Sequence, residues 1–294
     1  SSNNSVLVTD GGTWTNSGEL YVGGFGSGNS LVISNGGTVA SGIGYIGFTN
    51  TASNNSVLVT GEGSAWNGSS IAVGLYSSGN SLVISNGGTV AAAGDVFVGI
   101  FGSSNSVMIS NGGEFFVGTN LVISALGAES SNNSVSISGG SLTVTNGAID
   151  IGKGAVLEDE AGSGALNVTG GTVAVKELLV GTNSVITFNG GTIISEGTTI
   201  DSGTGFIIGD TGSGATFMAN GGTHNIDTTD TNIFTGLIVG NSGSSNSLVI
   251  SNGGTVQSSI LVLGGSPFDA EPSTTSSNNS VLVTGEGSAW NGSI

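Results

Sequence analysis

One block of eight residues, Asn-Ser-apolar-x-apolar-Ser/Thr-x-Gly, recurs along the whole 294-residue chain. The first five copies follow one another at steps of 25, 26, 25 and 25 residues. A fixed period of this size is typical of a solenoid, in which each repeat forms one coil stacked on its neighbours. The eleven copies, some of them loose, begin at Asn4, Asn29, Asn55, Asn80, Asn105, Asn133, Gly164, Asn183, Gly214, Asn246 and Asn279.

Within one coil the sequence predicts three short β-strands. In the coil that starts at Asn80 they cover residues 81–85, 89–90 and 95–98. Each run is rich in β-branched residues and is bounded by Gly, Asn and Ser, which is the signature of strands separated by tight turns. The Asn-Gly-Gly turn after the first run supplies residues that tolerate a positive φ at the bend.

An Asn-Gly pair between two strands is also a signal for an antiparallel hairpin, so a propeller or meander of hairpins is the alternative architecture. We favour parallel stacking, because equivalent strands share sequence at one phase in every coil. Eleven coils at about 4.8 Å each would make a rod of roughly 50 Å. We therefore expect an all-β chain that forms a single parallel β-helix, or β-solenoid, of about eleven coils over residues 1–294.

The middle of the chain departs from the regular period. After Asn105 the steps between blocks range from 19 to 33 residues. Strands must stay in register with the coils on either side, so the additional residues should lie in loops. We expect irregular coils with longer loops over residues 125–235. Residues 53–69 and 277–293 are identical, and from this restart we expect the chain to be a segment of a longer repeat array.

Charge and composition exclude several classes of partner. The chain has 2 Lys or Arg against 19 Asp or Glu, for a formal net charge of −17. Binding to nucleic acid or to anionic lipid needs clustered cations, so we expect neither partner. No apolar run approaches the roughly 18 residues that span a bilayer, so no membrane span is expected. A mean hydropathy of +0.30 and 56 glycines favour an ordered β chain over a disordered acidic one.

Catalytic chemistry is poorly supported by the residues present. Many parallel β-helices act on polysaccharides, and such sites need closely placed carboxylates or a carboxylate beside a cationic base. The chain has no Arg, two Lys in separate coils and one histidine, His224, which stands where other coils have Val39 or Val90. We interpret His224 as a structural or loop residue, and Asp227 and Asp230 as a solvated loop. We do not expect an enzyme or a cofactor.

Calcium binding is the next alternative. Glycine-rich β-rolls bind calcium through an Asp repeated in every turn, and no such Asp recurs here. The acidic run Glu158-Asp159-Glu160 could hold one ion loosely, but a plain acidic loop is the better interpretation. No metal site is predicted.

The Asn that opens most blocks is predicted to have a structural role. Identical amides stacked about 4.8 Å apart can donate hydrogen bonds to one another along the rod, which satisfies polar groups at a bend. The predicted ladder consists of Asn4, Asn29, Asn55, Asn80, Asn105, Asn133, Asn183, Asn246 and Asn279.

The alternation of residues in the first strand suggests a surface for association. Ser136 and Asn167 stand between two apolar residues, which indicates that this position faces outward. The equivalent residues are apolar in nine blocks: Leu7, Val32, Leu58, Val83, Met108, Ile186, Phe217, Val249 and Leu282. Exposed apolar stripes of that length are rare on monomers. We expect lateral association with like chains, with coverage by a segment outside this chain as the alternative.

A second stripe is predicted on the later strand of the coil. Asp150 indicates an outward position there, and its equivalents are Tyr21, Tyr45, Phe97, Val122, Leu179, Ile207 and Ile238. The same strand ends in Val-Gly in several coils, for example Leu20-Tyr21-Val22-Gly23 and Val96-Phe97-Val98-Gly99.

The first strand, Asn-Ser-Leu-x-Ile-Ser, and the later strand ending in Val-Gly together resemble the roughly 25-residue repeats of bacterial autotransporter passengers and PEP-CTERM-associated surface proteins. The resemblance covers nearly all of the chain and is weakest over residues 125–235. It implies a right-handed parallel β-helix that is secreted to the bacterial cell surface or beyond. That family contributes rods rather than a shared active site.

The sequence therefore favours an extracellular structural protein, a stiff stalk, sheath or filament segment that associates with like chains laterally or end to end. The first alternative is a surface adhesin that binds a glycan or a neighbouring cell through loops of the irregular coils. The scarcity of Trp and Tyr, 3 each, weakens that alternative. A carbohydrate-active enzyme is the second alternative, and it would require two carboxylates in one cleft on neighbouring coils.

Overall fold

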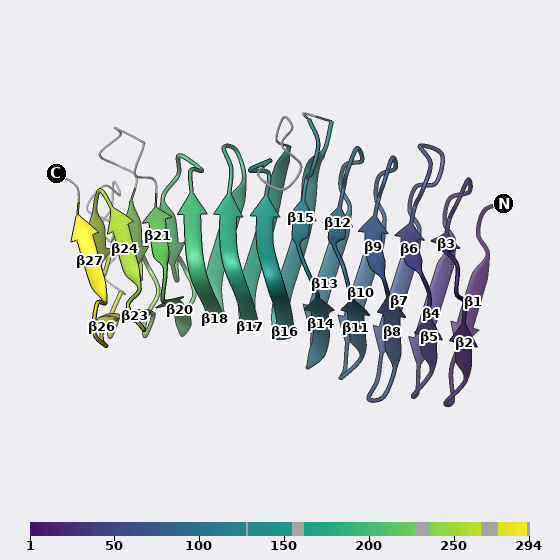
Figure 1. The fold of residues 1–294 in the computed structure, drawn as a ribbon, viewed down its shortest axis with the longest axis horizontal. Helices are drawn as coiled ribbons and strands as arrows, with labels where there is room; N and C mark the ends of the chain where they lie inside the picture. The colour runs from purple at the N-terminus through teal and green to yellow at the C-terminus, as the bar shows by residue number, and fades with distance from the viewer. Residues whose placement is uncertain (128, 155–161, 227–235, 266–275, 293–294) are drawn as a thin grey trace.

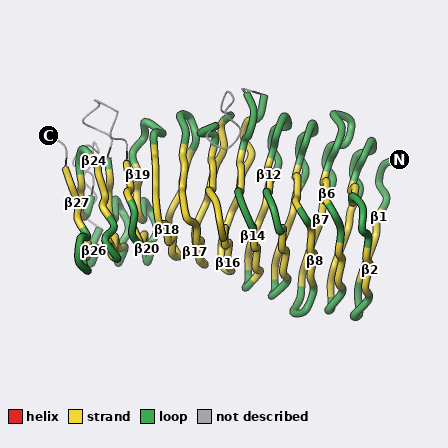
Figure 2. The backbone as a smooth tube through the Cα atoms, in the orientation of Figure 1, coloured by secondary structure: helices red, strands yellow, loops and turns green. Residues whose placement is uncertain are grey.

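The computed structural model describes residues 1–294 apart from 128, 155–161, 227–235, 266–275 and 293–294. The described part contains 27 β-strands and no helix. Its coils follow one another along a rod from the N-terminus to the C-terminus (Figure 1), and strands alternate with turns around the coils on either side of the long strands β16 (Ser131–Ile151) to β18 (Val185–Ile200) (Figure 2). The strand pairings in the described part are parallel. The parallel β-solenoid is therefore confirmed, and the hairpin alternative is wrong.

The strands stack into three columns, and each column has eleven levels within the described part. The first column contains β1 (Ser5–Val8), β4 (Ser30–Ser34), β7 (Ser56–Thr60), β10 (Ser81–Ser85), β13 (Ser106–Ser110), parts of β16, β17 and β18, then β19 (Phe206–Ile208), β22 (Leu237–Val239) and β25 (Leu261–Leu263).

The other two columns are built in the same way. The second contains β2 (Thr13–Thr15), β5 (Thr38–Ala40), β8 (Ala65–Gly68), β11 (Thr89–Ala92), β14 (Gly113–Val117), parts of β16 to β18, β20 (Ala215–Asn220), β23 (Ser247–Ser251) and β26 (Ser280–Val283). The third contains β3 (Leu20–Val22), β6 (Ile43–Ile46), β9 (Ser70–Val73), β12 (Val96–Val98), β15 (Leu121–Ile123), parts of β16 to β18, β21 (Thr223–Ile226), β24 (Thr255–Ser258) and β27 (Ala289–Gly292).

Three long strands pass through all three columns without a separate turn. These are β16 (Ser131–Ile151), β17 (Ser163–Val180) and β18 (Val185–Ile200). Register shifts between the strands, such as the one between Val144 and Ala148, mark the corners where the chain bends. A shift of this kind adds an unpaired residue and bends the strand. Within these three strands the chain thus turns at the corners while the strand continues, and separate strands return from β19 onward.

Alternation with a period of two residues fills the core. In β4 and β10, for example, the apolar residues at the second and fourth positions are buried, and the third position is half-buried on the outer face. The largest fully buried side chains include Trp66, Phe115, Phe188, Phe206 and Phe217. At about 25 cal/mol per Å2 of apolar surface, this continuous core is the main source of stability.

The repeat changes its phase by one column in the second half of the chain. The block near Asn183 contributes four strand segments instead of three: the three parts of β18 and then β19, which pairs with Phe188 in the first column. β20, the next block strand, therefore pairs with residues 191–195 of β18 in the second column. All later strands in the described part keep this shift, so β23 and β26 also lie in the second column.

Candidate functional site

An asparagine ladder, consisting of Asn4, Asn29, Asn55, Asn80, Asn105 and Asn133, runs along the corner between the third and first columns. Each side-chain amide donates to the Oδ1 atom of the next Asn at 2.7 to 3.1 Å. The same Oδ1 atom also accepts the backbone N–H of the preceding Asn at 2.8 to 3.1 Å. From Asn55 to Asn133 these side chains have no exposed surface. The ladder thus satisfies buried polar groups that the turn would otherwise leave unpaired.

The ladder is interrupted after Asn133, and the prediction for Asn183 is wrong. The ladder position of that coil is filled by Ser184, whose hydroxyl accepts the backbone N–H of Gly164 at 3.2 Å. Asn183 is exposed and has a φ of 63°, like the residue before the ladder position in other coils. Asn246 and Asn279 do form a hydrogen-bonded pair at 3.2 Å. Because of the phase shift, that pair lies at the corner before the second column.

A glycine from an earlier coil faces each ladder asparagine from Asn55 to Asn133, and also Asn246 and Asn279. A Cβ atom at that glycine would lie well inside van der Waals contact of the asparagine amide group. This close approach explains why so many third strands end in Val-Gly. The pairs are Gly23 with Asn55, Gly47 with Asn80, Gly74 with Asn105, Gly99 with Asn133, Gly209 with Asn246 and Gly240 with Asn279.

Two of the residues predicted for the association stripe point into the core. Phe217 is fully buried, and it pairs in register with inward-facing Ile193 and Leu248. Ile186 pairs with the buried Leu166 and packs against the core. In both blocks the ladder position, occupied by Ser184 or Ala215, lies one residue closer to the Asn-Gly-Gly turn than in the regular coils. A slip of one residue reverses the face. Outward positions of these two blocks are occupied by Thr187 and Thr216. The polarity of these two residues indicates the correct face of each strand.

The other seven stripe residues face outward but on two different columns. Val249 and Leu282 belong to the second column, where Met218 precedes them in register. The remaining five belong to the first column. At the later levels of that column, the same outward position is occupied by residues from other parts of the repeat. The first-column file, defined as the outward middle residue at each level, is Leu7, Val32, Leu58, Val83, Met108, Ser136, Asn167, Thr187, Ile207, Ile238 and Val262.

No charged residue occurs in the first-column strands at any of these eleven described levels. The second column contains the exposed Glu114, and the third contains the buried Asp150 and the exposed Glu177. Acidic residues near the first column, such as Asp10 and Glu62, lie in the turns at its edge. The phase shift matters here, because it moves Ile207, Ile238 and Val262 onto this face beyond the polar segment.

The predicted second stripe does not form one surface. Tyr21, Tyr45 and Phe97 do lie on the outer side of the third column, whereas Ile207 and Ile238 lie on the first. Val122, Asp150 and Leu179 also lie on the third column, but they are buried.

An aromatic cluster occupies the third column in the first coils. The rings of Tyr21 and Tyr45 stack at 5.1 Å between centroids, and Phe48 packs edge-on against both. The Tyr21 hydroxyl donates to the Glu19 carboxylate, and this hydrogen bond is the main cause that raises the pKa of Tyr21 to about 12. Tyr21 is 43% exposed, whereas Tyr45 is partly buried.

The residues considered for catalysis or metal binding do not come together in the described part. His224 is buried in the third column, paired with Thr198 and Val256. No group of three or more His, Cys, Asp or Glu residues that could hold a metal ion occurs among the described residues. Lys153 forms an ion pair with Asp201. Glu158, Asp159, Glu160, Asp227 and Asp230 lie outside the described residues.

His224 is held by two hydrogen bonds inside the core. Nε2 lies 2.8 Å from the Gly221 carbonyl oxygen and Nδ1 lies 2.9 Å from the Thr198 hydroxyl. A carbonyl only accepts, so Nε2 carries the proton and donates to Gly221. Nδ1 faces the Thr198 hydroxyl, which donates to the Ser195 hydroxyl at 3.2 Å. The ring also packs edge-on against Phe217 at 5.9 Å. Burial, the larger effect, lowers the pKa of His224, which keeps the ring neutral at neutral pH.

Acid should therefore destabilise the protein before its carboxylates titrate. The unfolded chain binds a proton at His224 near pH 6.5, whereas the folded chain does so only at lower pH. We expect the free energy of unfolding to fall as the pH drops from 7.5 to 5.5. Chemical denaturation followed by circular dichroism measures this, and His224→Val, the residue type of Val256, is the control. An equal decline in this variant, which has no histidine, would contradict the assignment.

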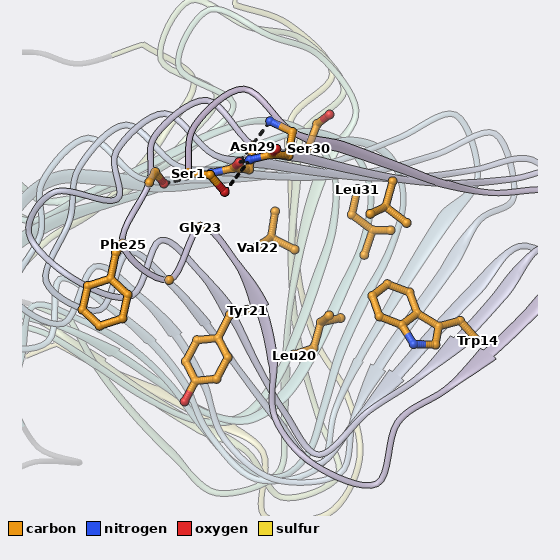
Figure 3. A pocket seen from close by; sticks show the side chains of 14 residues that line it. Ser1, Trp14, Leu20, Tyr21, Val22, Gly23, Phe25, Asn29, Ser30 and Leu31 are labelled. Atoms are coloured by element: carbon orange, nitrogen blue, oxygen red, sulfur yellow. Dashed lines mark hydrogen bonds between the residues drawn. The ribbon is translucent and has the colours of Figure 1, made fainter.

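Two hollows of the described part lie at the first coil and at a corner of the rod. The first, of about 380 Å3, is at the first coil, where Trp14, Leu20, Val22 and Leu31 surround it (Figure 3). These are inward-facing positions, so this hollow is an open end of the core. The second, of about 490 Å3, is a shallow depression at the corner between the second and third columns, where Lys176 and Glu177 contribute to its wall.

Comparisons with known protein families, curated proteins and solved structures add no assignment. No helix of the described residues is long and apolar enough to cross a bilayer. No protein-family model matches the chain, and no curated protein or solved structure is significantly similar to it.

Proposed function

We propose that this chain is a segment of an extracellular structural rod, a stalk, sheath or filament element that associates with like chains through an outer face. The observation that carries the proposal is the uncharged first-column face. In a chain with a net charge of −17, eleven successive described levels present no charge, and eight of them present an apolar side chain. Like-charged rods can approach one another only along such a face.

The interior supports a mechanical role. Three columns of in-register strands and a buried amide ladder connect neighbouring coils along the rod. Each coil contacts its neighbours only, as in other solenoids, so stiffness comes from the continuity of these contacts. The acidic turns keep the rest of the surface soluble and discourage non-specific binding.

Negative-stain microscopy across a range of protein concentrations tests this proposal. We expect rods that associate side by side into pairs or bundles as the concentration rises. Added salt should favour association, because the Debye length falls from about 30 Å at 0.01 M to about 3 Å at 1 M and repulsion between acidic turns weakens. Single rods at every concentration and salt level would contradict the associating role.

A surface adhesin is a second candidate function. The observation that favours it is the aromatic cluster of Tyr21, Tyr45 and Phe48, which lies on regular coils and not on the irregular loops. Glycan-array binding that is lost in Tyr21→Ala and Tyr45→Ala variants would support this candidate over the rod.

A further inference from the structure

We propose that the first-column face, the outer side of the first-column strands, binds a second copy of this chain. The two faces pack so that the polar segment of one copy lies on the polar segment of the other. The inference rests on the proposed function and specifies its partner and its surface. The polar window is defined as Ser136, Asn167 and Thr187, which interrupt the apolar first-column file at three successive levels. Four features of the face lead to this partner.

The first feature is charge. A foreign partner with a basic surface would be attracted to the acidic turns, but the first-column strands contain no charge in the described part. The other two columns contain carboxylates, Glu114 on the second and both Asp150 and Glu177 on the third. A partner that matches an uncharged face is itself uncharged over the same area, and the same face of a second copy has this property.

The second feature is apolar continuity. Outside the polar window the file is apolar, from Leu7 to Met108 and again from Ile207 to Val262. Leu7 and Met108 are 62% and 48% exposed. On the second column the same outward position carries small or polar residues such as Ala40, Asn67 and Ala174. Within the described part, large apolar residues occur there only at Phe116 and from Ile194 to Leu282. The first column is therefore the better apolar surface.

The third feature is the area available. Each level adds about 4.8 Å along the rod. Five consecutive strand residues, of which the first and the last face outward, span roughly 14 Å across it. Nine to eleven overlapping levels then cover roughly 600 to 700 Å2 on each copy, or about 1,200 to 1,500 Å2 in total. This lies at the lower end of the range for specific stable interfaces. The face is large enough to form a dimer without a further surface.

The fourth feature is self-complementarity. Asn167 donates to the Ser136 hydroxyl at 3.2 Å, so the window is already a hydrogen-bonded polar segment. A two-fold interface brings the same patch of both copies together. A window placed on the apolar file would bury polar groups without partners, which is unfavourable. The polar window of one copy therefore lies on the polar window of the other. This contact sets the register of the two rods and places Asn167 of one copy opposite Asn167 of the other.

Cross-linking at Asn167 tests this arrangement. Because the chain has no cysteine, an introduced cysteine is the only thiol that can react. Packed sheets lie about 10 Å apart, too far for a disulfide, which needs Cα atoms within about 7 Å. A thiol-to-thiol cross-linker of about 10 Å is therefore applied to Asn167→Cys. The matched control is Ala174→Cys, which is half-buried and outward in the same strand but on the second column. We expect a covalent dimer for Asn167→Cys and monomer for Ala174→Cys.

A charge on the face provides the second test. Val83→Lys places a cation in the apolar file, and Ala91→Lys places one at an outward position of the same coil on the second column. We expect association, measured by sedimentation equilibrium, to weaken at least about tenfold for Val83→Lys and to change little for Ala91→Lys. Circular dichroism verifies that both variants are folded.

The outcomes separate this inference from the proposed function. Equal cross-linking at residues 167 and 174, or undiminished association of Val83→Lys, would overturn the inference, while the associating rod would stand with a different face. A chain that stays monomeric at every concentration would overturn both.

Discussion

Asn80→Ala is expected to lower the free energy of unfolding by about 2 to 4 kcal/mol. The Asn80 Oδ1 atom accepts the backbone N–H of Asn55 at 2.9 Å and its side-chain amide at 3.1 Å. The Asn80 amide donates to Asn105 and to the Ser77 hydroxyl, both at 3.0 Å. Asn55, Asn80 and Asn105 are fully buried. Alanine therefore leaves a buried backbone donor unpaired and a small cavity, and each unsatisfied buried group costs about 1 to 3 kcal/mol.

The matched control for this substitution is Asn67→Ala. Asn67 is exposed on the outer side of β8, and exposed substitutions generally change stability by no more than about 0.5 kcal/mol. Guanidinium denaturation followed by far-ultraviolet circular dichroism compares the two variants. A similar loss of stability at both positions would mean that the ladder contributes no more than an ordinary surface amide.

Gly74→Ala is expected to destabilise the protein by about 2 to 5 kcal/mol. Gly74 has a φ of +78°, and a Cβ atom there would overlap the Asn105 amide. A left-handed conformation costs an L-residue about 1 to 2 kcal/mol, and overpacking in a tight interior adds about 1 to 3 kcal/mol. The same denaturation measurement gives the total.

Gly214→Ala separates the two contributions to that loss. Gly214 has nearly the same φ, +76°, but no atom lies within 4 Å of its hypothetical Cβ. It should therefore show the backbone strain alone, about 1 to 2 kcal/mol. If Gly74→Ala were no worse than Gly214→Ala, the close packing of glycine against the asparagine ladder would be refuted.

These two substitutions probe one structural unit. The glycine that ends a third strand and the asparagine that opens a block are far apart in the sequence, as in Gly74 and Asn105, yet they pack together in the rod. The same pair recurs after the phase shift as Gly209 with Asn246. The unit thus travels with the repeat and is not tied to one corner of the coil.

Much of the fold could be predicted from short-range patterns. In the coil at Asn80 the three predicted runs correspond to β10, β11 and β12, because alternation and Gly-rich turns act within a few residues. The inward residues of regular coils, such as Leu82 and Ile84, were implied by the same alternation. The burial of His224 agrees with its place in a position that is Val elsewhere.

The candidate site could be predicted less completely. The equivalent block positions predicted that Ile186 and Phe217 face outward, and the strand pairing shows that each faces the core. The error is one residue, but an alternation of period two converts it into the opposite face. Phe188 and Ala219 agree with this register of the two strands, because each is buried and directly follows an outward-facing residue.

The sequence by itself determined the coil: a repeat of strands and turns whose alternation separates core from surface at each level. Only the tertiary structure decided which blocks share a face. The additional strand β19 moves every later strand of the described part by one column, an effect that depends on how many strands precede a residue and not on its neighbours. For that reason Ile207, Ile238 and Val262 align with Leu7 and Met108, and an uncharged face runs along the rod.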